Sequence, residues 1–116
     1  WPSTGKVIRG YEPDVHKGID IDGKRGDPVL AVASGTVVYA GTGIVGLGEL
    51  LIVKHNEQYL SAYGNNDVLL VGEGDAVQTG QQIARKGSTG TDSVKLHFEI
   101  RKDGKPIDPQ RLLPRR

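Results

Sequence analysis

Residues 50–63 read LLIVKHNEQYLSAY, and this stretch is the clearest indication of how the chain folds. Two short runs rich in aliphatic and aromatic residues, Leu50–Lys54 and Tyr59–Tyr63, flank four polar residues. Short apolar runs separated by polar turn residues are typical of paired β-strands. The stretch therefore predicts a β-hairpin with its tip at Lys54–Tyr59. Within this tip His55 is interpreted as a turn residue rather than a metal ligand.

The same pattern of strand and turn continues through most of the chain. No segment shows a sustained apolar period of 3.6 residues, so a helix is expected only as a short turn at Pro109–Leu113. The 17 glycines supply the tight turns that many short strands require. The sequence predicts an all-β domain, a sandwich or a barrel. The other expected strands are Val29–Val32, Thr36–Ala40, Val68–Val71, Gln82–Lys86 and Val94–Arg101.

The sequence also contains a weak internal repeat, referred to below as the internal echo. The segments starting at Gly26-Asp27 and Gly74-Asp75 each read Gly-Asp-x-Val and lead into an apolar run. Such turns recur in hammerhead-like modules, including lipoyl and biotinyl domains, although two similar tight turns explain the echo equally well. No lysine occupies the hairpin tip that a lipoyl domain would modify.

Composition limits the classes of function. A length of 116 residues predicts one domain spanning residues 1–116, and the formal net charge is +1. There is no basic block and aromatic residues are few, which argues against nucleic-acid binding. The absence of cysteine excludes disulfides, cysteine-ligated zinc and thiol catalysis. The chain starts Trp1-Pro2 without methionine, so we expect a fragment of a longer exported protein.

Three residues could form a metal site. The segment His16-Lys17-Gly18-Ile19-Asp20 reads H-x-x-x-D, and in an extended segment His16 and Asp20 would face the same side. His97, in the last strong strand, could supply a third ligand. Imidazole nitrogen and carboxylate oxygen are normal zinc ligands, and three of them leave a coordination position open. A surface histidine beside a turn aspartate is the plainer explanation of H-x-x-x-D.

Lys95 shares parity with His97, so its side chain should project into the same cleft. A protonated amine beside Zn²⁺ is unfavourable unless it points away or pairs with an acid. A charged lysine also cannot accept a proton as a neutral imidazole does. A solvated lysine at the rim of a sheet is the alternative.

These residues lie in a sequence that resembles the LytM (lysostaphin-type) zinc metallopeptidase domain, and within it the NlpD-like branch of division-associated proteins. The resemblance covers nearly the whole chain and keeps the order of the motifs. It implies a two-sheet antiparallel β-sandwich with a long groove. The matching segments are His16–Ile21, Gly35–Gly41, Ile52–Asn56, Ser61–Tyr63, Gly80–Ala84, Gly87–Gly90, Leu96–Arg101 and Ile107–Pro114.

The resemblance implies that His16, Asp20 and His97 bind Zn²⁺. Active members carry two more histidines, which polarise the attacking water and stabilise the tetrahedral intermediate. These positions fall on Asn65, in Tyr63-Gly64-Asn65, and on Lys95. Losing general acid–base help costs roughly 10²–10⁴-fold in rate. The resemblance therefore implies a domain that keeps a metal-shaped pocket but does not cleave.

Non-cleaving members of the branch activate N-acetylmuramoyl-L-alanine amidases that split septal peptidoglycan. The resemblance thus implies an amidase activator with its groove as the docking surface. It also implies a periplasmic location, tethered to the outer membrane as part of a lipoprotein, and we expect a monomer. The alternatives are a zinc endopeptidase acting on peptidoglycan peptides, a peptidoglycan-binding module and, more distantly, a sugar phosphotransferase carrier. The carrier needs a second histidine near the phosphorylated one, where this chain has Lys95.

Overall fold

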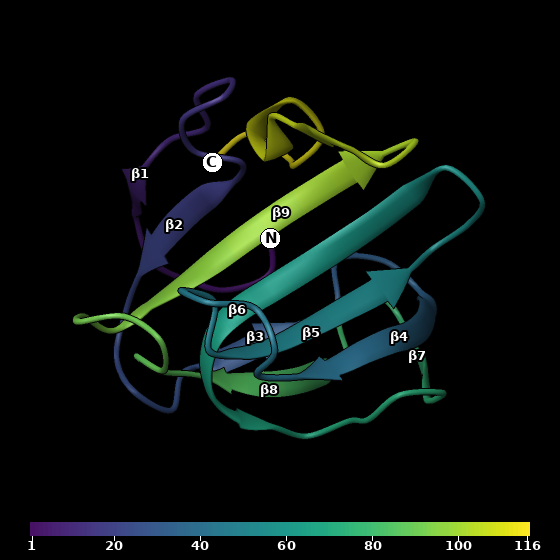
Figure 1. The fold of residues 1–116 in the computed structure, drawn as a ribbon, viewed down its shortest axis with the longest axis horizontal. Helices are drawn as coiled ribbons and strands as arrows, with labels where there is room; N and C mark the ends of the chain where they lie inside the picture. Colours follow the sequence, from purple (N-terminus) through teal and green to yellow (C-terminus); the bar gives the residue numbers. More distant parts are fainter.

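The two longest strands, β6 (Tyr59–Leu69) and β9 (Lys95–Lys102), lie side by side at the centre of the molecule (Figure 1). The computed structural model describes residues 1–116 and contains no α-helix. The remaining strands are β1 (Val7–Arg9), β2 (Ile19–Asp22), β3 (Pro28–Leu30), β4 (Gly35–Gly41), β5 (Glu49–Lys54), β7 (Ala76–Val77), β8 (Gln82–Lys86) and β10 (Lys105–Ile107). No helix has the length and apolar character needed to cross a bilayer.

All strand pairs are antiparallel, and hydrogen bonds connect them into one network. The larger layer has the order β1-β2-β9-β6-β5-β4-β7, with β10 added beside β9. The strands β3 and β8 form a smaller layer that is joined to the larger one through the C-terminal part of β6. The all-β antiparallel prediction is confirmed, and β6 carries the pairing from one layer into the other.

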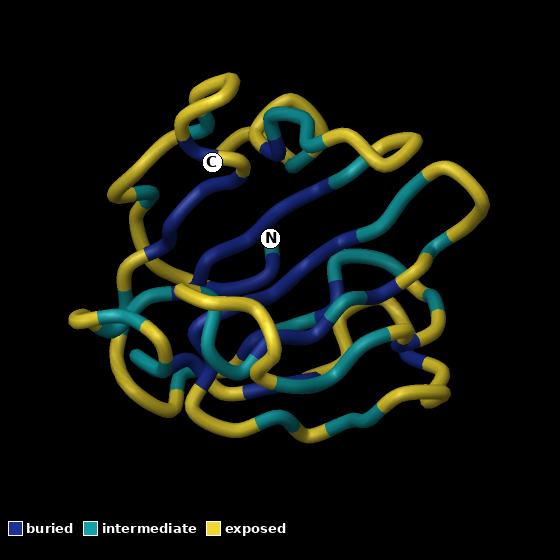
Figure 2. Tube along the Cα trace, viewed as in Figure 1, coloured by how far each residue is buried: buried dark blue, intermediate teal, exposed yellow.

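The core lies between the two layers. Along β9 the residues Leu96, Phe98 and Ile100 are buried in the same cluster as Val29 and Ile83 from the smaller layer. The alternating pattern of β9 places its other residues on the opposite face of the sheet. Figure 2 shows the buried residues running along the central strands, while most loops are exposed. One face of β9 is thus fixed by the core, and the other is available for a functional site.

The expected hairpin is present. β5 ends at Lys54, β6 begins at Tyr59, and the His55 amide donates to the Tyr59 carbonyl at 3.0 Å. The His55 ring folds back over the hairpin, with Nδ1 2.8 Å from the Ser34 carbonyl and Nε2 2.7 Å from Ser61 Oγ. Both ring nitrogens of His55 are therefore used in hydrogen bonds around the hairpin, as its position in the sequence suggests.

One strand prediction is wrong. Val68–Val71 is not a separate strand, because β6 runs without interruption from Tyr59 to Leu69. At Asn65 the backbone has φ of 64°. The pairing of β6 with β9 ends at Gly64 and its pairing with β5 ends at Asn66, and from Asn66 to Leu69 β6 pairs with β8. The residues Gly64-Asn65-Asn66 form the bend of one long strand. The expected helical turn is a 3-10 helix, η1 (Pro109–Arg111).

The internal echo corresponds to two turns of the same construction. In one, the Lys24 amide donates to the Asp27 carboxylate at 2.8 Å across Gly26, which has φ of 91°. In the other, the Gly72 amide donates to the Asp75 carboxylate at 2.8 Å across Gly74, with φ of 89°. Glycine adopts such a positive φ without the steric cost that other residues meet. The echo is a repeated tight turn.

Candidate metal centre and cleft

The candidate metal centre rests on the pairing of β2 with β9. Asp20 lies directly opposite His97 in the register of these two strands. Ile19 and Ile21 on one side and Leu96 and Phe98 on the other belong to the core, so Asp20 and His97 project from the opposite face. Their side chains meet there, with His97 Nδ1 2.7 Å from Asp20 Oδ1. The core pattern of two strands thereby positions two of the predicted ligands.

His16 reaches the same point from a loop. It closes a tight turn in which the Glu12 amide donates to the His16 carbonyl at 3.0 Å and Asp14 has φ of 65°. His16 therefore lies outside β2, and the expectation of one extended segment from His16 to Asp20 is wrong. The turn nevertheless directs the ring inward, where Nε2 lies 3.2 Å from Asp20 Oδ1.

The structure thus brings His16, Asp20 and His97 together. All three are buried, and one ligand atom from each lies within 4.8 Å of the others. The two imidazole rings meet edge to face with centroids 5.0 Å apart. Two imidazole nitrogens and a carboxylate oxygen are a donor set that suits Zn²⁺. The residues present therefore fit the metal that the sequence predicts.

The hydrogen bond between Asp20 and His97 shifts the pKa values of both groups. Burial by itself would raise the pKa of Asp20, but hydrogen bonding to His97 and the nearby positive charges lower that pKa to about 2. Burial would likewise lower the pKa of His97, while hydrogen bonds to Asp20 and Glu99 raise it to about 9. For His16 burial prevails and the pKa is lowered. Both shifts favour an ionised carboxylate at Asp20 and a protonated ring at His97.

Glu99 completes the surroundings of His97 and was not anticipated from the sequence. His97 Nε2 donates to Glu99 Oε2 at 2.7 Å. Arg101 donates to Glu99 Oε1 through Nε at 3.0 Å and a terminal nitrogen at 2.8 Å. A carboxylate behind a histidine fixes the ring and its tautomer, which is the usual arrangement around metal-ligating histidines. The alternation His97-x-Glu99-x-Arg101 on one strand face is the signal that could have revealed it.

Lys95 projects into the same cleft, as parity suggests. Its Nζ lies 3.2 Å from Asp20 Oδ2, the oxygen that the two histidines leave free. The side chain is only partly exposed. An ammonium that pairs with an acid can stay beside a metal-shaped pocket, because the carboxylate offsets its charge. Asp20 therefore contacts three cationic or potentially cationic groups at once.

Asn65 does not face the three ligands as a free donor. Its side chain is 1% exposed, and its amide nitrogen donates to the carbonyls of Gly46 at 3.0 Å and Thr89 at 2.8 Å. Its backbone amide donates to the Leu47 carbonyl at 2.7 Å. Asn65 thus holds together two loops beside the cleft, and both amide hydrogens are used.

The cleft around these residues has a volume of about 410 Å³. Val15 borders it from the loop before β2, while Ile44 and Val45 border it from the loop between β4 and β5. These apolar residues are exposed, Val45 completely so. Arg9 and Lys17 add positive charge at the rim. The cleft therefore combines a charged floor with exposed apolar walls.

Comparison with known proteins gives the family. Residues 14–109 match peptidase family M23. Over its whole length the chain is 60% identical to a lipoprotein NlpD/LppB homolog of Pseudomonas aeruginosa, of which the match covers 40%. It is 53% identical, again over its whole length, to the murein hydrolase activator NlpD of Escherichia coli, of which the match covers 31%. The chain thus spans well under half the length of these relatives.

A solved structure supports the same assignment. A zinc containing peptidase from Vibrio cholerae superposes with a TM-score of 0.88 at 29% identity, over 93% of this chain and 37% of that one. The lipoyl-domain and phosphotransferase-carrier alternatives are set aside by these matches. From the sequence match over residues 14–109 and the shared fold, the chain belongs to peptidase family M23.

Proposed function

We propose that this domain activates an N-acetylmuramoyl-L-alanine amidase during the splitting of septal peptidoglycan and does not itself cleave. The observation that carries the proposal is that the side chains of Asn65 and Lys95 are engaged in contacts with other residues of the domain. Both occupy positions where the LytM resemblance places catalytic histidines, and both are held in other contacts. The E. coli relative, described as a murein hydrolase activator, supports the same conclusion.

The chemistry of these two residues argues against peptide hydrolysis. Lys95 donates to Asp20 as an ammonium and so cannot accept a proton from water while it stays paired. Asn65 has no amide hydrogen left for a developing oxyanion. Loss of an oxyanion donor costs roughly 10²–10³-fold in rate, in addition to the loss of acid–base help.

We further propose that His16, Asp20 and His97 hold Zn²⁺, with Glu99 orienting His97. The convergence of the three ligand atoms and the carboxylate behind His97 support this assignment. In an active member of the family, Zn²⁺ supplies a Lewis acid at this point. In this chain the metal would instead join β2, β9 and the loop before β2, and so help to shape the cleft.

The cleft is the proposed docking surface for the amidase. Exposed apolar side chains on both walls are the kind of surface that a partner covers. Val15 and Val45 stand on opposite loops, so one apolar segment of the partner could contact both. Arg9 and Lys17 would favour acidic residues beside that segment.

The proposal also places the whole protein in the cell. The P. aeruginosa relative is described as a lipoprotein. We infer an outer-membrane lipoprotein whose domain acts in the periplasm on peptidoglycan-bound amidase, with the domain itself a monomer. Sedimentation of the isolated domain would test the oligomeric state.

The deciding experiment measures release of dye-labelled fragments from purified peptidoglycan. The zinc-loaded protein alone, a division amidase alone and their mixture are compared. Release from the mixture beyond the rate of the amidase establishes activation. A Val45→Asp variant should lose this gain, while Val68→Asp, on β6 and also exposed, should keep it. No gain from the mixture would overturn the proposal.

Zinc endopeptidase activity is the second candidate, and the intact ligand cluster favours it. Release by the protein alone, abolished by a chelator, would establish it. A non-catalytic peptidoglycan-binding module is the third candidate. Sedimentation with insoluble peptidoglycan and no effect on amidase rate would favour that function.

A further inference from the structure

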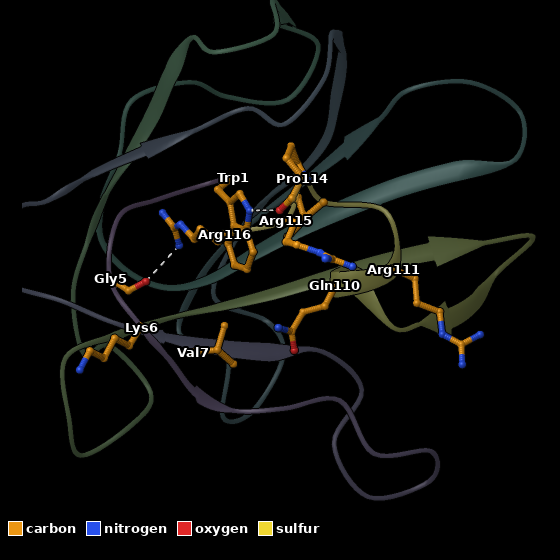
Figure 3. Close-up of a pocket in the computed structure, with 10 residues that line it drawn as sticks. Trp1, Gly5, Lys6, Val7, Gln110, Arg111, Pro114, Arg115 and Arg116 are labelled. Carbon is orange, nitrogen blue, oxygen red and sulfur yellow. Dashed lines mark hydrogen bonds between the residues drawn. The ribbon is translucent and has the colours of Figure 1, made fainter.

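A second pocket, separate from the cleft, lies where the N-terminal segment meets the C-terminal one (Figure 3). Its volume is about 630 Å³, and it shares no residue with the cleft around Asp20. Trp1 and Val7 line it from the N-terminal segment, and Gln110 and Leu113 from the region of η1. The volume of this pocket is within the usual range for a site that binds a small ligand.

The charged side chains that line this pocket are all cations. They are Lys6, Arg111, Arg115 and Arg116, and no acidic side chain accompanies them. The chain as a whole carries a formal charge of only +1, so this grouping is a local excess. In the cleft, by contrast, Asp20 and Glu99 offset the cations.

None of the four cations has an ion-pair partner. The salt bridges of the molecule involve none of Lys6, Arg111, Arg115 and Arg116. Figure 3 shows Lys6 and Arg111 at opposite ends of the pocket, with Arg115 between them. Unpaired cations around a concave surface raise the local concentration of anions. Their separation suits a ligand with several spaced negative charges better than a single small ion.

One of the four cations, Arg116, is nevertheless held in place by other contacts. The Arg116 guanidinium lies 4.2 Å from the centroid of the Trp1 ring and donates to the carbonyls of Ser3 at 2.6 Å and Gly5 at 3.0 Å. The Trp1 indole nitrogen donates to the Pro114 carbonyl at 2.7 Å. These contacts hold an aromatic wall and a positive charge in position before any ligand arrives, which lowers the entropy cost of binding.

We propose that this pocket binds an acidic peptide carrying at least two carboxylates, of the kind that peptidoglycan stem peptides present. The spaced guanidinium and ammonium groups recognise the carboxylates, and Trp1, Val7 and Leu113 contact the aliphatic parts. The choice of a wall peptide rests on the proposed function. The pocket would keep the domain on its polymer while the cleft remains free for the amidase.

The test uses Trp1 as its own reporter. It is the only tryptophan among residues 1–116, so the intrinsic tryptophan fluorescence of this domain reports on the pocket. The protein is titrated with soluble stem peptide released from purified peptidoglycan and with the same peptide after amidation of its carboxylates. Inorganic phosphate and vesicles containing anionic phospholipid are titrated separately. We expect a saturable change with the acidic peptide, weakened at about 0.5 M NaCl, and none with the amidated form.

Two charge-matched variants locate the site. Arg111→Gln with Arg115→Gln should weaken binding about tenfold or more, because two charge-assisted contacts are lost. Lys24→Gln with Arg85→Gln removes the same charge from exposed positions outside the pocket and should leave binding unchanged. Circular dichroism confirms that both variants are folded.

Several results would overturn the inference. These are no change with acidic peptide, an equal loss in both double variants, saturation by phosphate at the same concentration, or a response to anionic vesicles only. The last would show a lipid-facing surface instead. No amidase is present in this titration, so a negative result leaves the activation assay untouched. Binding without activation would instead contradict the proposed function.

Discussion

Lys95 Nζ lies 3.2 Å from Asp20 Oδ2, on the one carboxylate oxygen that His16 and His97 leave free. Asp20 is therefore shared between the candidate metal ligands and a fixed positive charge. A metal at this point would keep its three ligands but would stand beside an ammonium. This arrangement is compatible with binding and unfavourable for high affinity.

Replacing Lys95 should strengthen zinc binding. In Lys95→Gln the ammonium is removed while much of the side chain's length is kept, so we expect about a tenfold lower Kd for Zn²⁺. Competition with a fluorescent zinc chelator measures it. Lys95→Arg keeps the charge and should bind zinc like the parent protein. Equal affinity in all three proteins would show that Lys95 turns away when the metal binds.

Asp20→Ala should destabilise the protein even in a chelator. It leaves Lys95 and His97 without their carboxylate, and breaking a buried ion pair from one side costs about 3–5 kcal/mol. Excess zinc should stabilise the parent protein further and leave the variant unchanged, since ligand binding adds to stability. Chemical unfolding with and without zinc gives both quantities. A parent protein insensitive to zinc would contradict the proposed ligand set.

Asn65→Ala should cost about 2–4 kcal/mol of unfolding free energy. It leaves the carbonyls of Gly46 and Thr89 without their donor and places alanine at a positive φ. Asn65→Gly keeps the backbone conformation and loses only the hydrogen bonds, so it separates the two contributions. Urea unfolding of the three proteins measures the differences. Unchanged stability in both variants would show that Asn65 does not hold these loops.

Stability should rise with pH in the alkaline range because of Lys86. This side chain is fully buried, and its Nζ donates to the carbonyls of Thr4 at 2.9 Å and Asp22 at 2.8 Å. Burial lowers its pKa below the usual 10.5, although Asp27 and Asp22 oppose the effect. Between the lowered pKa and 10.5 the unfolded chain binds more protons than the folded one, so the unfolding free energy increases with pH there.

A lysine-to-methionine pair tests this slope. Lys86→Met should flatten the dependence of unfolding free energy on pH, while Lys24→Met, at an exposed position, should keep it. Urea unfolding followed by circular dichroism at several alkaline pH values gives the slopes. If unfolding free energy depends on pH in the same way in Lys86→Met and in the parent protein, the pKa of Lys86 does not differ between the folded and unfolded states.

The strands that pack into the core could be predicted from the sequence, because alternation of apolar residues reports burial directly. Gln82–Lys86 is observed with the predicted bounds, and the hairpin at Lys54–Tyr59 is where its polar residues place it. The short edge strands β1, β7 and β10 were missed. They contain two or three residues each, too few for a pattern, and depend on their neighbours for pairing.

The site was predictable to the extent that its residues alternate along one strand. Because alternate residues of a strand face the same side, Lys95 was expected beside His97. The same alternation extended by two residues would have included Glu99. The role of Asn65 was beyond the sequence, because its partners Gly46 and Thr89 are brought together only by the fold. Propensity likewise gave no sign that β6 would bend at Asn65 and continue.

The two faces of β9 bear on how the proposed activation would work. Leu96, Phe98 and Ile100 are locked in the core, so the strand that carries His97 and Lys95 cannot slide or twist without disturbing the packing between the layers. A partner that enters the cleft would therefore meet a floor whose backbone shape is already set. Under the proposed function, the conformational change that switches the hydrolase on then takes place in the hydrolase and not in β9.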